Sequence, residues 1–163
     1  MDANYHTHTY RCGHARGSDE QYVRAAIDGG FSILGFSDHV PYIGVHKPSD
    51  RMDYEQIDDY LNSIASLKEK YAGQIEIKVA FEIEFFPELL DYYKSLRERV
   101  DYLICGQHNT YSLEDDLDSY ANDHDVKAYA DHVVMAVESG VIDYLAHPDY
   151  FMLGRRHWSK ACA

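Results

Sequence analysis

Strand-like and helix-like segments alternate along this chain, and the alternation limits its fold more than any other feature. Apolar residues follow the two-residue period of a strand, or form short apolar runs, at 4–9, 31–39, 75–85, 101–108 and 141–149. They follow helical spacing at 18–29, 53–73, 87–99 and 126–140. Five strands separated by helices predict an α/β fold with a parallel sheet, either doubly wound or closed as a barrel.

Residues with metal-binding side chains stand at the ends of successive predicted strands. In chain order they are His6, His8, His39, Glu82, His108 and His147. The intervals from His8 onward are 31, 43, 26 and 39 residues, each about the length of one βα unit. Strand ends converge on one mouth in a barrel, whereas a doubly wound sheet would spread them along an edge. The pattern therefore favours a barrel-like arrangement.

The first predicted strand carries a His-x-His pair. Because side chains alternate across a strand, His6 and His8 share one face, and His14 follows in the loop beyond. Imidazole and carboxylate groups are ligands of zinc and similar divalent metals. Two such metals can generate hydroxide and polarise a phosphoryl group, which suits phosphate-ester hydrolysis without a protein nucleophile. Glu82 and Glu84 share a face of their strand, so the pattern does not decide between them.

Other reactive or charged side chains lie near the same strand ends. We expect Cys12 to be a small packed thiol rather than a soft metal ligand. Arginine suits bidentate contacts with phosphate. The candidates for a contact with a substrate phosphate are Arg155, Arg156 and Arg11. The histidines expected on the solvated surface or in local capping roles are His46, His124, His132 and His157.

The amino-acid composition limits the classes of molecule that the protein is expected to bind. The net charge of −13, from 28 acidic and 15 basic residues, disfavours nucleic acid and anionic membranes but allows a small phosphorylated substrate at a metal site. The N-terminus lacks the pattern of a signal peptide, and no apolar run approaches the ~20 residues of a membrane helix. The three cysteines are far apart and suggest no disulfide framework. We expect one domain in the cytoplasm.

Five segments of the chain together resemble the PHP family, named for polymerase and histidinol phosphatase. They are "HTHTYRCGH", "GFSDH", "VAFEIEFFPE", "ICGQH" and "LAHPDYF", in the order and context of the family's signatures. The stretches "RCGHA" and "LAHPDYFM" are most similar to the histidinol-phosphatase branch. The resemblance implies a (β/α)7 barrel with three divalent metals. The His-rich set of ligands suits Zn2+, and mixed sites with carboxylates also take Mn2+ or Fe2+. The resemblance further implies that L-histidinol phosphate is hydrolysed to L-histidinol and phosphate by a metal-bound hydroxide.

The resemblance also assigns ligands. It implies that His6 and His8 hold the first metal, His108 and His147 the second, and His14 and His39 the third. Glu82 would bridge the first two metals and is favoured over Glu84, because it directly follows the "VAF" of the strand.

The chain departs from the family pattern in one respect. The family domain ends with a further strand carrying Asp-x-His, which this sequence does not contain. We therefore expect residues 1–163 to be the N-terminal portion of a PHP domain, with about five βα units of an incomplete barrel. We expect weaker loading of the third metal, and we expect a second copy or another chain to close the open edges. The alternatives are a PHP phosphoesterase or nuclease acting on another phosphate ester, and a catalytically impaired metal-binding module.

Overall fold

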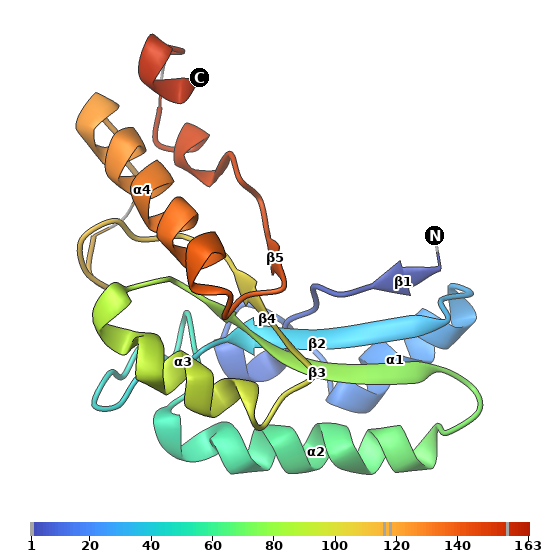
Figure 1. Ribbon diagram of the computed structural model, residues 1–163. Coiled ribbons are helices and arrows are strands. Elements are labelled where there is room, and N and C mark those ends of the chain that lie inside the picture. Colours follow the sequence, from blue (N-terminus) through green and yellow to red (C-terminus); the bar gives the residue numbers. More distant parts are fainter. Residues whose placement is uncertain (1, 116, 118, 156) are drawn as a thin grey trace. The chain divides into compact units, whose positions relative to one another are not determined.

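The computed structural model describes residues 2–115, 117, 119–155 and 157–163. Its strands are β1 (Ala3–Asn4), β2 (Ile33–His39), β3 (Glu76–Ile83), β4 (Tyr102–Cys105) and β5 (Tyr144–Leu145). Its α-helices are α1 (Asp19–Asp28), α2 (Ile57–Lys70), α3 (Leu90–Arg97) and α4 (Asp123–Ser139) (Figure 1). Short 3-10 turns are η1 (Tyr10–Cys12), η2 (Tyr54–Gln56), η3 (Pro87–Leu89), η4 (Tyr150–Met152) and η5 (Lys160–Cys162). The predicted alternation of strands and helices is confirmed.

The chain divides into two compact units. The first contains the described residues up to Glu82 together with Val100–Tyr102. The second contains Ile83–Arg99 and the described residues from Leu103 onward. Each unit has its own sheet pairings and its own buried side chains.

Parallel pairing in the first unit places the carboxyl ends of β2 and β3 side by side. β1 pairs with β2 at Ala3↔Ile33, and β2 pairs with β3 from Ile33↔Glu76 to His39↔Glu82. His39 therefore ends its strand directly opposite Glu82. The strand predicted at 4–9 is only two residues long, because the pairing with β2 then passes to a side chain. Ser37 N–H still donates to Thr7 O at 2.8 Å, but Thr7 N–H donates to Ser37 Oγ at 3.2 Å.

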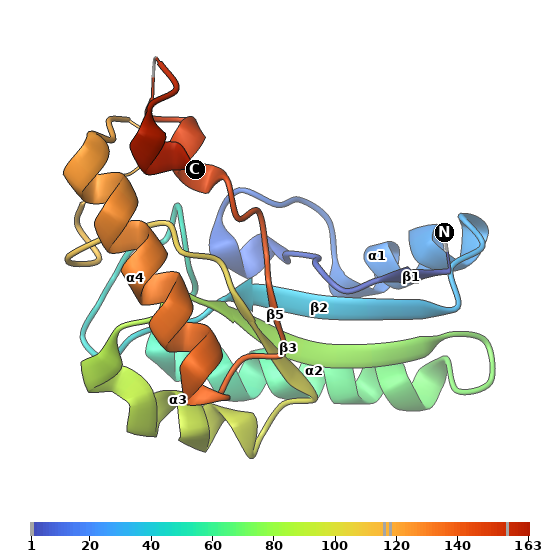
Figure 2. The same ribbon diagram turned by 45° about the horizontal axis from the view of Figure 1, so that its top comes forward.

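Helix α2 covers one face of this sheet, and Figures 1 and 2 both show it running along β3. Its apolar stripe is buried and consists of Ile57, Tyr60, Ile64 and Leu67. The Tyr60 and Phe81 rings lie 5.3 Å apart, and the Tyr60 hydroxyl donates to Ala80 O at 3.0 Å. Helix α1 starts as its sequence predicts, since Ser18 and Gln21 form a capping box. The packing of α2 against the sheet thus supports the strand ends that carry His39 and Glu82.

The second unit is built around β4, β5 and α4. β4 and β5 are parallel, with Ile104 opposite Tyr144 and Cys105 opposite Leu145. Asn122 caps the start of α4, and Gly140 ends the helix in the left-handed conformation at φ +67°. The buried cluster under α4 consists of Leu117, Ala121, Val126, Tyr129 and Phe151.

Pairing is parallel for β1 with β2, for β2 with β3, and for β4 with β5. This agrees with the α/β class predicted from the sequence. Among the helices that the structure describes, none is both long enough and apolar enough to cross a bilayer.

Candidate metal centre

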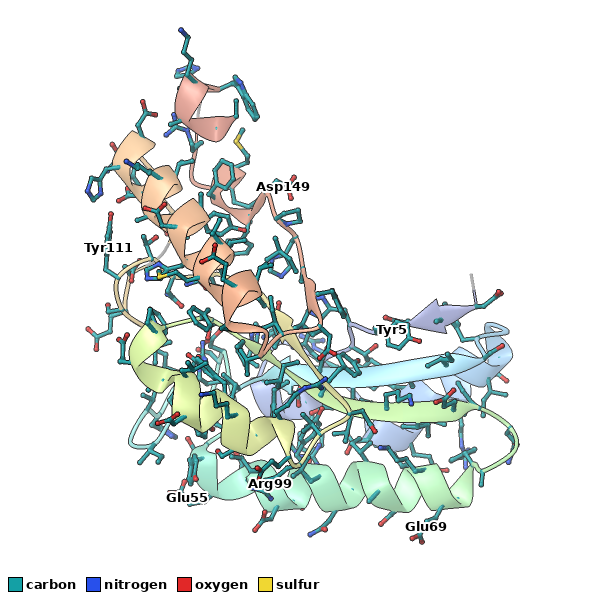
Figure 3. All side chains as sticks on the ribbon, in the orientation of Figure 1. Tyr5, Glu55, Glu69, Arg99, Tyr111 and Asp149 are labelled. Carbon is teal, nitrogen blue, oxygen red and sulfur yellow. The ribbon has the colours of Figure 1, made fainter. Side chains whose placement is uncertain are left out.

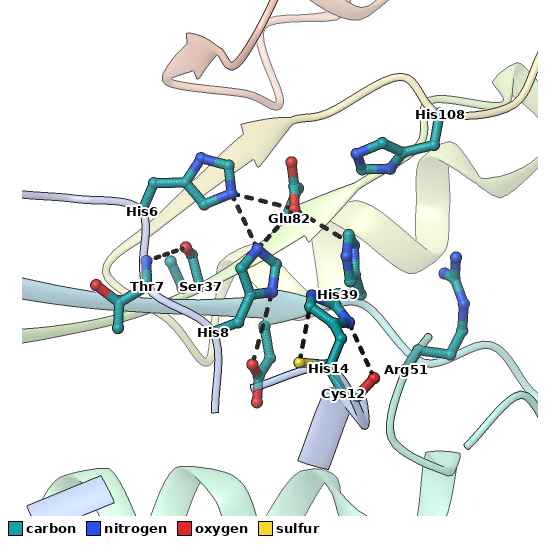
Figure 4. A network of polar contacts seen from close by, with 12 residues as sticks. His6, Thr7, His8, Cys12, His14, Ser37, His39, Arg51, Glu82 and His108 are labelled. Atoms are coloured by element: carbon teal, nitrogen blue, oxygen red, sulfur yellow. Dashed lines mark hydrogen bonds and ion pairs between the residues drawn. The ribbon is translucent and has the colours of Figure 1, made fainter. Parts of the chain in front are cut away.

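A buried carboxylate in the first unit is surrounded by three imidazoles. Glu82 Oε2 lies 3.2 Å from His6 Nε2, 3.2 Å from His8 Nε2 and 3.3 Å from His39 Nδ1. Figure 4 shows the rings of His6, His8 and His39 gathered around Glu82. The Glu82 side chain is 1% exposed, whereas His6 and His8 keep partial access to solvent. Ligand atoms of His8, His39 and Glu82 all lie within 4.8 Å of one another. One oxygen and several nitrogens at this spacing fit a divalent metal of the zinc type.

Local backbone geometry explains why these residues meet. His6 and His8 are two residues apart in an extended segment and both approach Glu82, as the period of a strand predicts. His39 and Glu82 face each other because β2 and β3 are parallel and in register. The sequence prediction that these four residues cluster is consistent with this geometry.

Without a metal, the surroundings of His8 favour the protonated, positively charged form of its imidazole. Burial lowers the pKa of His8, but its contacts with Cys12 and Glu82 outweigh burial and raise the pKa to about 10. A proton held between an imidazole and a carboxylate occupies the place that a bound cation would take. Metal binding at this cluster should therefore release protons.

Asp38, which precedes His39, was not singled out by the sequence reasoning. Its side chain is fully buried, and it accepts hydrogen bonds from the Thr9 backbone N–H at 2.5 Å and from the Thr9 hydroxyl. Burial raises the pKa of Asp38, although the bonds from Thr9 oppose this. Asp38 Oδ1 also lies 3.8 Å from His8 Nδ1. Asp38 thus fixes the backbone just beyond the His-x-His pair.

His14 lies beside the same cluster. Its ring centre is 5.1 Å from that of His8 and 5.4 Å from that of His39. A cysteine joins the group, since ligand atoms of His8, Cys12 and His14 also lie within 4.8 Å of one another. The loop that carries His14 depends on Gly13, whose φ is +79° and whose missing Cβ would fall 2.1 Å from Pro48 O.

The second unit brings His108 and His147 together. Their ring centres are 5.0 Å apart, and the Tyr150 ring lies 4.7 Å from that of His108. His108 Nδ1 is 2.8 Å from Glu84 Oε1, and the Glu84 side chain is fully buried. His147 has a φ of +28°, a strained conformation that is concentrated at functional sites and costs about 1–3 kcal/mol. Glu84 fixes the orientation of an imidazole here, which the strand pattern could not show.

The structure tests two of the three arginines that were predicted to contact the substrate phosphate. Arg11 is buried, and its guanidinium donates to Asp19 and to Asp59, each at 2.9 Å. Arg155 donates to Ala121 O and, at 2.6 Å, to Asp123 Oδ1. Both guanidinium groups are therefore held by the protein's own acceptors, which disfavours them as phosphate ligands. Arg156 lies outside the described residues.

A hollow of about 730 Å3 opens beside the first cluster. His6, His8 and His14 line it, together with the exposed side chain of Arg16. Volumes of this size suit small-molecule ligands. Arg16 is the basic residue that the structure places at this hollow, and its loop position gave no sequence signal that separated it from surface arginines.

Comparison with known proteins identifies the family. The model of the PHP domain matches residues 4–163. The chain belongs to the PHP family. A solved structure supports the fold: histidinol phosphate phosphatase from Lactococcus lactis, complexed with zinc, L-histidinol and phosphate, aligns with a TM-score of 0.72 at 15% identity. That alignment covers 92% of this chain and 59% of the other.

Two curated relatives carry the name "Probable histidinol-phosphatase". The protein from Deinococcus radiodurans is 28% identical over 153 residues, which cover 88% of this chain and 59% of the relative. The protein from Schizosaccharomyces pombe is 30% identical over 170 residues, which cover 96% of this chain and 53% of the relative. The chain thus spans little more than half the length of these two relatives. The predicted family and fold class are confirmed.

Proposed function

We propose that this chain carries the metal-binding residues of a phosphomonoesterase that hydrolyses L-histidinol phosphate to L-histidinol and phosphate. The observation that carries the proposal is the convergence of three imidazoles on the buried Glu82 carboxylate. The names of the relatives support the substrate, and so does the L-histidinol and phosphate bound by the structural neighbour from Lactococcus lactis.

In this proposal each unit contributes its own ligands. In the first unit, His6, His8, His39 and Glu82 hold metal, and His14 adds a further ligand beside them. In the second unit, the ligands are His108 and His147, with Glu84 fixing the His108 ring. Zn2+, Mn2+ or Fe2+ bound by these groups would supply Lewis acidity to the phosphoryl oxygens and activate water.

The substrate phosphate needs a local positive charge, because the chain as a whole carries −13. Arg16 lines the hollow next to His6, His8 and His14, and its side chain is exposed to solvent. We assign the phosphate contact to Arg16 in place of Arg11, whose guanidinium is committed to Asp19 and Asp59. Arginine at this position can offer paired N–H donors to a phosphate.

Phosphate release from L-histidinol phosphate tests the function, with an aryl phosphate and single-stranded DNA as competing substrates. We expect release that EDTA abolishes and that added Zn2+ or Mn2+ restores. His6→Ala should lower the rate more than about 100-fold, because a ligand is lost where even supporting residues contribute 10–100-fold. His46→Ala is the matched control, since the His46 side chain is 72% exposed and pairs with Asp53, which lies outside the cluster.

The other outcomes separate the alternatives. Cleavage of DNA in preference to the phosphomonoester would indicate a nuclease. Stoichiometric metal binding without turnover of any of the three substrates would indicate a metal-binding module, and would overturn the proposal.

A further inference from the structure

Cys12 lies where a metal ligand would be expected. Its side chain is fully buried, and its Sγ is 3.6 Å from His14 Nε2. One ligand atom each from His8, Cys12 and His14 lies within 4.8 Å of the other two. Two imidazoles and a thiol at this spacing form a donor set typical of zinc.

The hydrogen bonding of His14 favours coordination. His14 Nδ1 lies 3.2 Å from the backbone carbonyl oxygen of Cys12. A carbonyl oxygen only accepts, so the proton of the neutral ring resides on Nδ1. The lone pair is then on Nε2, the atom that faces the Cys12 sulfur. A backbone carbonyl often selects the ring tautomer of metal-binding histidines in this way.

The backbone holds Cys12 and His14 in place before any ligand arrives. Cys12 ends the turn η1, whose start is capped by the Thr9 hydroxyl. Gly13 follows in the left-handed conformation and fits closely against the Pro48 carbonyl. A site on such a fixed turn loses little conformational entropy when it binds an ion.

We propose that Cys12 is a thiolate ligand, with His14 and His8, of a zinc-type ion in the first unit. This inference rests on the proposed metal-dependent function and refines its metal site. On binding, the thiol proton leaves to solvent and a sulfur–metal bond forms, which replaces the weak hydrogen bond from Cys12 Sγ to Thr9 O at 2.9 Å. A soft sulfur ligand selects zinc or cobalt over magnesium or manganese at this position.

Cobalt substitution of the full chain tests this directly. Co2+ bound by sulfur has a thiolate-to-metal charge-transfer band in the near ultraviolet, whereas nitrogen and oxygen ligands give only weak visible bands. We expect the band in the unmodified protein and its loss in Cys12→Ala. The double variant Cys105→Ala/Cys162→Ala leaves Cys12 as the only one of the three cysteines, and should keep the band.

The outcomes are decisive whether or not the protein is a phosphatase. Visible cobalt bands without a near-ultraviolet band in the unmodified protein would overturn the Cys12 assignment and leave the proposed function standing. Loss of the band in the double variant, or no cobalt binding at all, would also overturn it. A band that depends on Cys12, in a protein that hydrolyses no phosphate ester, would support the metal site and count against the proposed function. If Cys12→Ala does not fold, the double variant alone decides.

Discussion

Replacing Glu82 with glutamine removes the one negative charge at the centre of the first cluster and preserves the shape of the side chain. Glu82 Oε2 is within 3.3 Å of three imidazole nitrogens and is almost inaccessible to solvent. We therefore expect the variant to fold, because glutamine fills the same volume, and to bind zinc much more weakly, because a neutral amide is a poor ligand.

The size of the loss follows from burial. Removing one partner of a buried charged pair costs about 3–5 kcal/mol, since the other charge stays desolvated without compensation. At about 1.4 kcal/mol per factor of ten, this corresponds to a zinc affinity that is lower by roughly 140- to 3,700-fold. The solvent access that remains at His6 and His8 places the expected value in the lower half of this range.

Competition with a chromophoric chelator measures the affinity, and circular dichroism confirms the fold. Glu69→Gln is the matched control, because Glu69 lies exposed on α2 (Figure 3). The control should bind zinc as the unmodified protein does. If Glu82→Gln, correctly folded, bound the same number of zinc ions with an affinity within about threefold of the unmodified protein, Glu82 would not be a metal ligand.

Three further predictions concern supporting residues. Glu84→Gln should weaken metal binding by the second unit about 10–100-fold, measured by the same competition, whereas an unchanged affinity would rule out its positioning role. Gly13→Ala should lower the melting temperature more than Gly44→Ala, because both have positive φ but only Gly13 is crowded by the backbone; equal losses would contradict this. Although burial raises the pKa of Asp101, bonds from Lys68 and a backbone N–H lower it overall. Its contribution is present above the ordinary carboxyl pKa and is lost as the pH falls through the lowered value. The destabilisation by Asp101→Asn in urea should thus be larger at pH 7 than at pH 2, and equal effects would contradict it.

The strand-end residues show how far the sequence can predict a site. The two-residue period places His6 and His8 together, and parallel pairing places His39 opposite Glu82. Both rules are local or depend on regular register, so they can be applied without a structure. The alternation could not separate Glu82 from Glu84. In the structure, Glu82 meets the imidazoles of the first unit, and Glu84 meets His108.

The partners of the arginines could not be predicted from the sequence. Arg11 appeared suited to phosphate because it lies within the histidine segment, but its partner Asp59 comes from a helix 48 residues away. Arg155 is bound in the same manner by Asp123, 32 residues away. Neither separation has a period that a sequence pattern could reveal. Cys12 is a further example, because its chemistry depends on which nitrogen of His14 faces it.

Anomalous diffraction at the zinc absorption edge, on crystals of the full chain grown with zinc, tests the central claim most directly. We expect a strong peak within bonding distance of Glu82 and the imidazoles of His6 and His8. Zinc-saturated crystals with no anomalous peak beside Glu82 would contradict it.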